Sequence, residues 1–230
     1  MRLVITVMVS LAMLIVAGCE RPMRVSHNEI VSLEYAVNRV AVIGDSYTAG
    51  TDIGGLGAKG WPARAWRELA SQRTPVTADV GAEGGAGYGT RGNRGSLFED
   101  LTATTVKPDD ALVVFFGSRN DQRVDPARLS VLAYGTFQLA RRLAPSAALL
   151  VIGPPWPTAD PPPEVLRIRD ALRYQAGLAG ATFVDPIEQR WFVGKPDLIG
   201  ADGVHPTDAG RAYLARQIAP LIAARLPARL

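Results

Sequence analysis

The chain has 230 residues, of which 47% are hydrophobic and 20% are charged, as is typical of one globular domain with short additional segments. The net charge is only +3, and the sequence lacks the basic runs with interleaved aromatic residues that a nucleic-acid-binding surface needs. One cysteine and two histidines supply neither a disulfide framework nor a cysteine- or histidine-based metal site. We therefore expect no nucleic-acid partner and no metal or organic cofactor.

The N-terminal segment has the pattern of an export signal. Arg2 precedes an apolar run over residues 3–16, which is short for a membrane span, and small residues lead from there to Cys19. Residues 16–19 resemble a bacterial lipobox, in which the cysteine becomes the lipidated first residue of the mature protein. We predict that residues 1–19 are a signal peptide, and that the protein is anchored to a membrane through Cys19 or secreted to the cell envelope. An ordinary cleaved signal and an uncleaved anchor helix are the alternatives.

Residues 20–38 are mixed and polar without a sustained period, and we interpret them as a tether to a domain over residues 39–230. In that domain, short apolar runs predict buried strands at residues 40–43, 76–80, 111–116, 148–152 and 182–184. Helical patterns, several of them opened by a proline or a capping residue, predict helices at residues 63–71, 126–143, 164–178 and 208–226.

Strands of unbroken apolar residues, separated by helices, are typical of a parallel sheet that is covered on both faces. The predicted fold is therefore a three-layer α/β/α sandwich with a mostly parallel sheet. In open sheets of this kind, sites form beyond the carboxyl ends of the strands, so chemistry is expected in the loops that follow them.

The loops after the first three strands hold candidate catalytic groups. Ser46, in Gly44-Asp45-Ser46-Tyr47, lies where a strand turns into a helix, and it is either an exposed nucleophile or a helix cap. A glycine-rich loop over residues 81–88 allows backbone N–H groups to approach a ligand closely. Asn120, in the segment 117–121, has an amide that can donate to a developing oxyanion without titrating, although it also suits a simple turn.

Near the C-terminus, Asp202 precedes His205 by three residues. At this spacing a carboxylate can reach back to the imidazole, fix its tautomer and stabilise the imidazolium. A lone Asp-x-x-His pattern is weak evidence. However, His205 is the only histidine of the predicted domain and lies just before the last helix.

Other catalytic motifs do not explain the sequence. Residues 55–60 satisfy G-x-G-x-x-G, but they lie in the middle of a loop rather than at the end of a strand where a dinucleotide fingerprint belongs. No Walker motif and no G-x-S-x-G nucleophile elbow occurs. Trp61, Trp156 and Trp191 lie in or beside loops near the expected site, and we interpret them as packing residues.

Together, in this order, these blocks resemble the SGNH (GDSL-like) hydrolase superfamily from about Arg39 to Leu226. The resemblance implies a flavodoxin-like fold, with Ser46 as nucleophile, His205 as its base and Asp202 as the partner of the histidine. It also implies an oxyanion hole from the N–H of Ser46, the N–H of Gly85 (or Gly84) and the side chain of Asn120. Tyr47 replaces the usual leucine, and we expect it to contact substrate. Ser118 occupies the glycine position of the Gly-x-Asn-Asp block.

Three functions are compatible with these residues. The first is a serine esterase or lipase-like hydrolase that cleaves carboxylic esters of a lipid or glycan at the cell envelope. The second is an acyltransferase that passes the acyl group to a sugar hydroxyl. The third is a non-catalytic envelope-binding lipoprotein, which would not need the complete set of Ser46, Asn120, Asp202 and His205. We expect the hydrolase.

Overall fold

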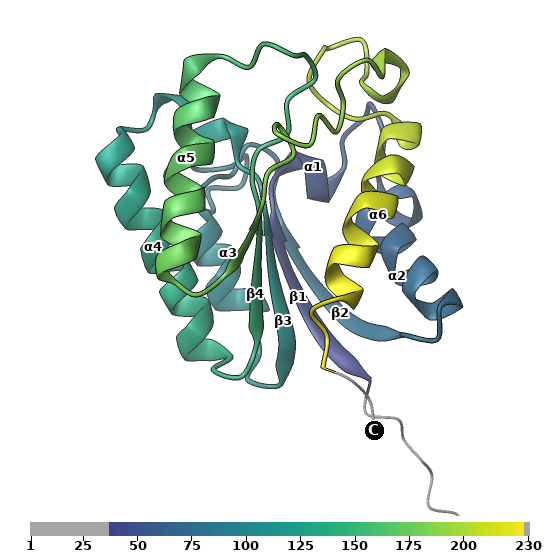
Figure 1. Ribbon diagram of the computed structural model, residues 1–230, viewed down its shortest axis with the longest axis vertical. Helices are drawn as coiled ribbons and strands as arrows, with labels where there is room; N and C mark the ends of the chain where they lie inside the picture. The colour runs from purple at the N-terminus through teal and green to yellow at the C-terminus, as the bar shows by residue number, and fades with distance from the viewer. Residues whose placement is uncertain (1–36, 228–230) are drawn as a thin grey trace, which may run out of the picture. The chain divides into compact units, whose positions relative to one another are not determined.

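The computed structural model describes residues 37–227, in which a five-stranded sheet lies between two layers of helices (Figure 1). All strand pairs are parallel and follow the order β2-β1-β3-β4-β5. The strands are β1 (Asn38–Gly44), β2 (Val76–Ala82), β3 (Asp110–Phe116), β4 (Ala148–Ile152) and β5 (Thr182–Val184). This is the doubly wound, flavodoxin-like strand order, and the predicted fold class is confirmed.

The apolar runs of the sequence become strands that are buried on both faces. In β3, Val113 and Phe115 pack into one core cluster, while Leu112, Val114 and Phe116 pack into the other, and all five are fully buried. Successive side chains of a strand point to opposite faces, so a sheet covered on both sides needs apolar residues at every position.

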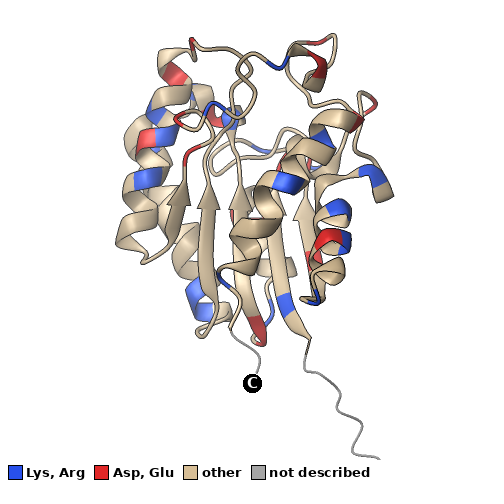
Figure 2. Cartoon of the chain, turned by 45° about the vertical axis from the view of Figure 1, so that its right-hand side comes forward, with Lys and Arg blue, Asp and Glu red and all other residues tan. Residues whose placement is uncertain are grey.

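Two helical layers cover the sheet. On one face lie α3 (Phe98–Thr105), α4 (Pro126–Leu143) and α5 (Pro163–Leu178), and on the other lie α2 (Trp61–Ser71) and α6 (Asp208–Ala223) (Figure 1). The four-residue α1 (Ser46–Ala49) follows β1, and three short 3₁₀ turns complete the connections: η1 (Gly57–Lys59), η2 (Arg119–Arg123) and η3 (Pro196–Leu198). Charged side chains lie mainly on the helices and loops, and the strands carry very few (Figure 2).

Two of the predicted helix starts, those of α4 and α6, are confirmed by their caps, whereas α2 begins at Trp61, two residues before its predicted start. The Asp125 carboxylate accepts the N–H of Arg128 over 2.9 Å, and the Thr207 hydroxyl accepts the N–H of Gly210 over 3.2 Å. The predicted end of the last helix is wrong by three residues, since α6 stops at Ala223. Leu226 instead packs against the core from beyond the helix, where Pro227 disfavours helical geometry for the preceding residue.

Two further elements differ from the prediction. Helix α3 was not predicted, because its eight residues contain three threonines and show no long apolar period; a hydrogen bond of 2.9 Å from the N–H of Leu97 to the Asp100 carboxylate closes its first turn. Strand β1 begins at Asn38, which the sequence assigned to the tether. The predicted signal peptide with Cys19, and the tether up to residue 36, lie outside the described residues.

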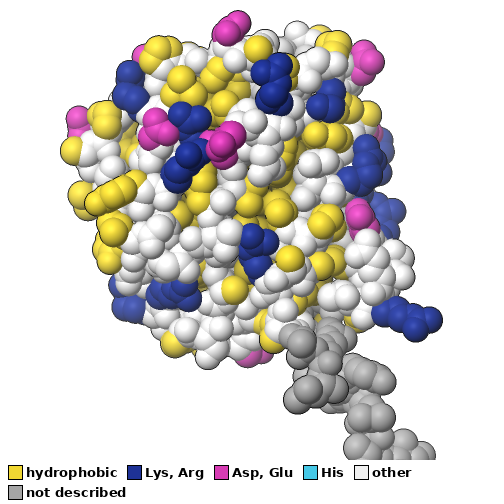
Figure 3. Space-filling view, viewed as in Figure 1, with side chains coloured by type: hydrophobic (Ala, Val, Ile, Leu, Met, Phe, Trp, Pro, Cys, Tyr) yellow, Lys and Arg dark blue, Asp and Glu magenta, His cyan; other side chains and the backbone are white. Residues whose placement is uncertain are grey.

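The surface of the described part is mixed in character. On the face seen in Figure 3, basic and acidic side chains are interspersed with apolar ones. Within residues 37–227, no helix has both the length and the apolar character needed to cross a membrane. Among the same residues, no group of three or more histidine, cysteine, aspartate or glutamate side chains is placed to hold a metal ion.

Candidate active site

Ser46 lies at the carboxyl end of β1, where the chain turns into α1. Strand β1 is flanked by β2 and β3, so Ser46 lies at the point where the strand order reverses, which is where doubly wound sheets form their sites. The Asp45 carboxylate accepts the N–H of Tyr47 over 2.8 Å and caps the short helix. Gly44 must be glycine here, because a Cβ would lie 2.2 Å from the Thr48 hydroxyl.

The loop before α6 brings His205 and Asp202 to this serine. The Ser46 hydroxyl lies 3.0 Å from His205 Nε2, and His205 Nδ1 lies 2.6 Å from an Asp202 carboxylate oxygen. The other carboxylate oxygen accepts the N–H groups of Val204 and His205 over 2.9 and 3.0 Å. Partial desolvation raises the pKa of Asp202, but these N–H groups and the imidazole outweigh it and hold the value at about 2. Asp202 therefore stays ionised beside the imidazole at neutral pH.

Tyr47 has a different role from the one expected. Its ring is 1% exposed and packs in the core, and its hydroxyl donates a hydrogen bond to the carbonyl of Val204. Burial raises the pKa of Tyr47 to about 12, so the phenol stays protonated and remains a donor. The expected substrate contact is wrong, because a fully buried side chain does not face the cleft; Tyr47 instead ties the nucleophile turn to the histidine loop.

The glycine loop after β2 contributes backbone donors to the same edge. Gly84 and Gly85 both line the cleft around Ser46, and Gly85 has a φ of +80° that a side chain would strain. Within residues 37–227, the N–H groups of Ser46 and Gly85 donate to no acceptor, so both are available to a ligand. Both candidate glycines of the loop therefore lie at the site.

Asn120 joins this loop from the end of β3. Its side-chain amide nitrogen donates to the carbonyl of Ala86 over 2.8 Å and lies 3.4 Å from an Asp45 oxygen. Its backbone N–H donates to the Ser118 hydroxyl over 3.0 Å, so the serine at the glycine position of the motif orders the turn. An amide nitrogen carries two hydrogens, and the one that makes only the long 3.4 Å contact is the one left to donate to an oxyanion.

Asp121, to which the sequence assigned no role, holds the glycine loop in place. Its buried carboxylate accepts the N–H groups of Tyr88 and Gly89, each over 2.9 Å. A Cβ on Gly87 would lie 2.5 Å from the same carboxylate, which explains the glycine at that position. The aspartate after Asn120 in the motif was the sequence signal for this function.

Asp45 is a second buried carboxylate at the site, and it is 2% exposed. Burial raises its pKa to about 7, although the N–H of Tyr47 and the guanidinium groups of Arg211 and Arg119 act in the opposite direction. This carboxyl therefore lies close to its titration point at neutral pH.

Arg211, on α6, lies beneath the nucleophile turn and is fully buried. Its guanidinium donates to the backbone carbonyls of Ser46 and Tyr47, and more weakly to that of Pro206 over 3.4 Å. Burial lowers its pKa to about 10, so it remains charged at neutral pH. No motif in the sequence pointed to this arginine, because its position depends on how α6 packs.

A cleft of about 620 Å³ lies over these groups and is lined by Ser46, Asn120 and His205 together with the glycine loop. Arg119 also lines it and places its guanidinium 4.4 Å from the centre of the Trp156 ring. The other two tryptophans are packing residues as predicted, since Trp61 and Trp191 are both buried in the core.

A serine paired with an imidazole, an imidazole paired with a carboxylate, and donors that converge on one point are the parts needed for acyl transfer from an ester. The fold and this site define an enzyme of the esterase and lipase class. The chain belongs to the GDSL-like Lipase/Acylhydrolase family, whose model matches residues 42–213. It is 61% identical over 212 residues to GDSL lipase Rv0518 of Mycobacterium tuberculosis, covering 91% of this chain and 90% of that protein.

Solved structures share the fold at lower identity. A lipase/acylhydrolase from Enterococcus faecalis has a TM-score of 0.65 and 16% identity, over 83% of this chain and 97% of that one. Phospholipase A1 from Streptomyces albidoflavus has a TM-score of 0.57 and 17% identity, over 82% of this chain and 99% of that one. A family two carbohydrate esterase from Clostridium thermocellum has a TM-score of 0.64 and 16% identity, over 81% of this chain and 64% of that one. These names differ in substrate, so the shared fold does not define one.

Proposed function

We propose that the protein hydrolyses carboxylic esters through an acyl intermediate on Ser46, with His205 as base and Asp202 as the group that orients it. The observation that carries this proposal is the 3.0 Å contact between the Ser46 hydroxyl and His205 Nε2, because it is the distance at which a base can take the proton of the nucleophile.

In the first half of the reaction, Ser46 Oγ attacks the ester carbonyl while its proton passes to His205 Nε2. The negative charge on the carbonyl oxygen is held by the N–H groups of Ser46 and Gly85 and by the Asn120 amide. Asp202 stabilises the imidazolium through Nδ1. The tetrahedral intermediate then collapses, the bond to the alcohol oxygen breaks, and the alcohol leaves with the proton from His205.

In the second half, water attacks the acyl-serine while His205 Nε2 takes its proton. The bond from the acyl carbon to Ser46 Oγ then breaks, the serine takes the proton from His205, and the carboxylic acid is released. The His205 side chain is 26% exposed, so water reaches the imidazole. This solvent access favours hydrolysis over transfer of the acyl group to a sugar hydroxyl, which needs water to be excluded.

The test is hydrolysis of p-nitrophenyl acetate, butyrate and octanoate by the purified full-length chain, beside Ser46→Ala. Ser71→Ala is a matched control, since Ser71 is an exposed serine at the end of α2. We expect turnover by the wild type and by Ser71→Ala, and none by Ser46→Ala. A fluorophosphonate should label the wild type at Ser46, and slow labelling in His205→Ala would support the role of the base. Equal turnover by the Ser46→Ala variant would overturn the proposal.

The proposed natural substrate is a lipid or glycan ester at the cell envelope, and the proposed location is the exported side of a membrane, with Cys19 as the lipid attachment point. Support comes from the signal and lipobox pattern of residues 1–19. Expression in a bacterial host, followed by fractionation, tests the location. The wild type should partition with membranes, and Cys19→Ser should lose the lipid; a non-lipidated wild type in the cytoplasm would contradict both proposals.

A further inference from the structure

Arg119 brings a fixed guanidinium to the active-site cleft. The residue begins η2, directly before Asn120, and both residues line the cleft together with Ser46. The guanidinium carbon of Arg119 lies 4.4 Å from the centre of the Trp156 ring. The indole nitrogen of Trp156 in turn donates to the Thr158 hydroxyl over 3.1 Å, which orients the ring. Stacking on an aromatic face holds the planar group in one orientation, so little rotamer freedom is lost when it binds a ligand.

The charge of Arg119 has no carboxylate partner within residues 37–227. Its Nη1 is buried and donates to no acceptor there, and none of the ion pairs of this part of the chain involves it. Asp45 is the nearby acid: burial raises the pKa of Asp45, and the charge of Arg119 acts in the opposite direction. A charged donor group that is left incompletely paired is unfavourable, so an anion that enters the cleft would supply the missing countercharge.

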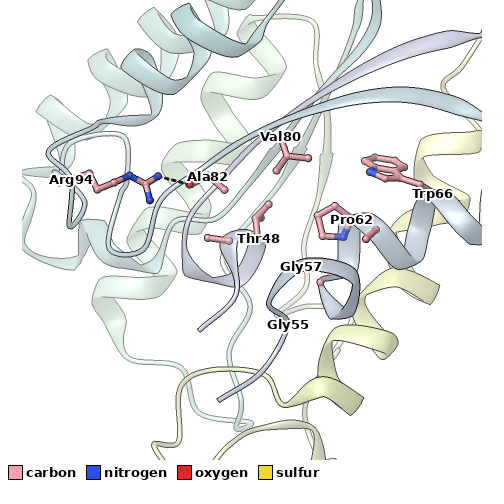
Figure 4. A pocket seen from close by; sticks show the side chains of 11 residues that line it. Thr48, Gly55, Gly57, Pro62, Trp66, Val80, Ala82 and Arg94 are labelled. Atoms are coloured by element: carbon pink, nitrogen blue, oxygen red, sulfur yellow. Dashed lines mark hydrogen bonds between the residues drawn. The ribbon is translucent and has the colours of Figure 1, made fainter. Parts of the chain in front are cut away.

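Arg94, a second arginine of the cleft, is already paired. Its side chain donates to the carbonyl of Ala82 over 3.1 Å, as Figure 4 shows, and lies 3.9 Å from the buried Glu83 carboxylate. The backbone N–H of Arg94 donates to the same carboxylate, which fixes this residue to the glycine loop. Of these two arginines, Arg119 is therefore the one whose charge is available to a ligand.

Arg119 lies on the side of the cleft from which the alcohol leaves. Its guanidinium is close to the Tyr47 hydroxyl, because burial raises the pKa of that phenol and Arg119 opposes the rise. The same hydroxyl donates to the carbonyl of Val204, the residue before His205. The alcohol has to leave beside His205 Nε2, since that nitrogen returns the proton to it. A charged group on the alcohol would therefore lie near Arg119.

We propose that Arg119 binds an anionic group on the alcohol half of the substrate, and that the enzyme prefers esters whose alcohol carries a phosphate or a carboxylate to esters of neutral alcohols. The inference rests on the proposed ester hydrolysis and adds its substrate class. Phosphate and carboxylate share the paired oxygens that a guanidinium binds through two N–H groups. A charge-assisted interaction of this kind contributes roughly a 10- to 100-fold preference in kcat/KM.

The experiment compares kcat/KM for acetate esters whose alcohol half is charged or neutral. The anionic substrates are para-acetoxybenzoate and para-acetoxyphenyl phosphate, and the neutral reference is para-acetoxybenzamide. Arg119→Gln removes the charge, and Arg119→Lys keeps it without the planar fork. Arg123→Gln is the matched control, at an exposed arginine of the same turn that does not line the cleft. We expect Arg119→Gln to lower the anionic-to-neutral ratio about tenfold or more, Arg119→Lys to lower it less, and Arg123→Gln to leave it unchanged.

Two further comparisons define the ligand. A larger fall for one of the two anionic esters in Arg119→Gln would support the site and identify whether the alcohol carries a phosphate or a carboxylate. The pair of p-nitrophenyl hydrogen adipate and its neutral monoamide places the charge on the acyl half instead. An effect of Arg119→Gln that is confined to this pair would overturn the assignment to the alcohol.

The outcomes separate this inference from the function on which it rests. Hydrolysis of all these esters by Arg119→Gln with an unchanged anionic-to-neutral ratio would overturn the anion site alone. Equal losses on charged and neutral esters would show that Arg119 acts only on the structure of the site, and would overturn it too. A folded wild type that hydrolyses neither neutral nor anionic esters would overturn the proposed function and the anion site with it.

Discussion

Arg211 Nη1 donates a hydrogen bond of 3.0 Å to the backbone carbonyl of Ser46, although the two residues are 165 positions apart in the chain. The same guanidinium reaches the carbonyls of Tyr47 and Pro206, so one buried cation contacts both the nucleophile turn and the residue after His205. The hydroxyl of Tyr47 adds a second connection to the histidine loop through Val204. The distance between Ser46 and His205 is therefore set by groups beneath the site that never touch substrate.

Arg211→Met should slow catalysis and destabilise the protein. Loss of the charged hydrogen bonds leaves buried carbonyls without a donor, and we expect a fall of about 3 kcal/mol in the free energy of unfolding. Displacement of the nucleophile turn should lower kcat by about tenfold or more and leave KM nearly unchanged, since Arg211 does not line the cleft. Kinetics and thermal unfolding measure the two effects. Arg216→Met, at an exposed arginine of the same helix, is the control, and equal losses in both variants would contradict a positioning role.

Asn120→Ala should be folded and severely impaired. The substitution removes one donor from the oxyanion site, for which the usual loss in kcat is about 10²–10³-fold. It also removes the bond to the carbonyl of Ala86, so a modest fall in melting temperature is expected. The measurement is kcat on a p-nitrophenyl ester, with fluorophosphonate labelling of Ser46 to show that the nucleophile is intact. A loss of less than about threefold would exclude Asn120 from the oxyanion hole.

The sequence was sufficient for the strands and the layer architecture, because apolar runs such as residues 111–116 have one plausible environment, a sheet covered on both faces. It also placed Ser46, Gly85, Asn120, Asp202 and His205 at loop positions that the structure brings to one edge. Local motifs carry this information, because each block fixes its own turn.

The parts that the sequence did not predict depend on contacts between distant segments. Arg211 belongs to no motif, and Tyr47 was expected to contact substrate, because its burial depends on the placement of the histidine loop, whose Val204 carbonyl accepts its hydroxyl. Helix α3 is stabilised by packing of Phe98 and Leu101 in the core more than by its own threonine-rich composition.

Asp45→Asn should make the stability of the protein less dependent on pH. The pKa of Asp45 is raised by burial to about 7, against about 3.9 for an unfolded aspartate, so the native state binds more protons between these values. The contribution of the protonated Asp45 carboxyl to the free energy of unfolding is therefore fully present at low pH. It decreases as the pH rises from about 4 to about 7, by up to roughly 4 kcal/mol. Asparagine keeps an oxygen for the N–H of Tyr47. The measurement is the melting temperature of both proteins from pH 5 to 8, and parallel curves would contradict the raised pKa.

Asp202→Asn should abolish most activity while the site keeps its shape. The native carboxylate accepts a hydrogen bond from the protonated Nδ1 of His205. This leaves Nε2 free to take the proton of Ser46. An amide in the same place can donate to Nδ1 and favour the wrong tautomer, and it cannot stabilise the imidazolium, so kcat should fall roughly 10³- to 10⁴-fold.

The same substitution should change the response of stability to acid. Because the pKa of Asp202 is held at about 2, the wild type keeps this carboxylate ionised well below neutral pH. The contribution of Asp202 to stability is lost only as the pH falls from about 4 to about 2. The variant should therefore lose the acid-sensitive part of the melting curve in that range as well as activity at pH 7. Asp197→Asn, at an exposed aspartate of η3, is the matched control and should retain full activity. Activity in Asp202→Asn within tenfold of the wild type would show that His205 does not need this partner.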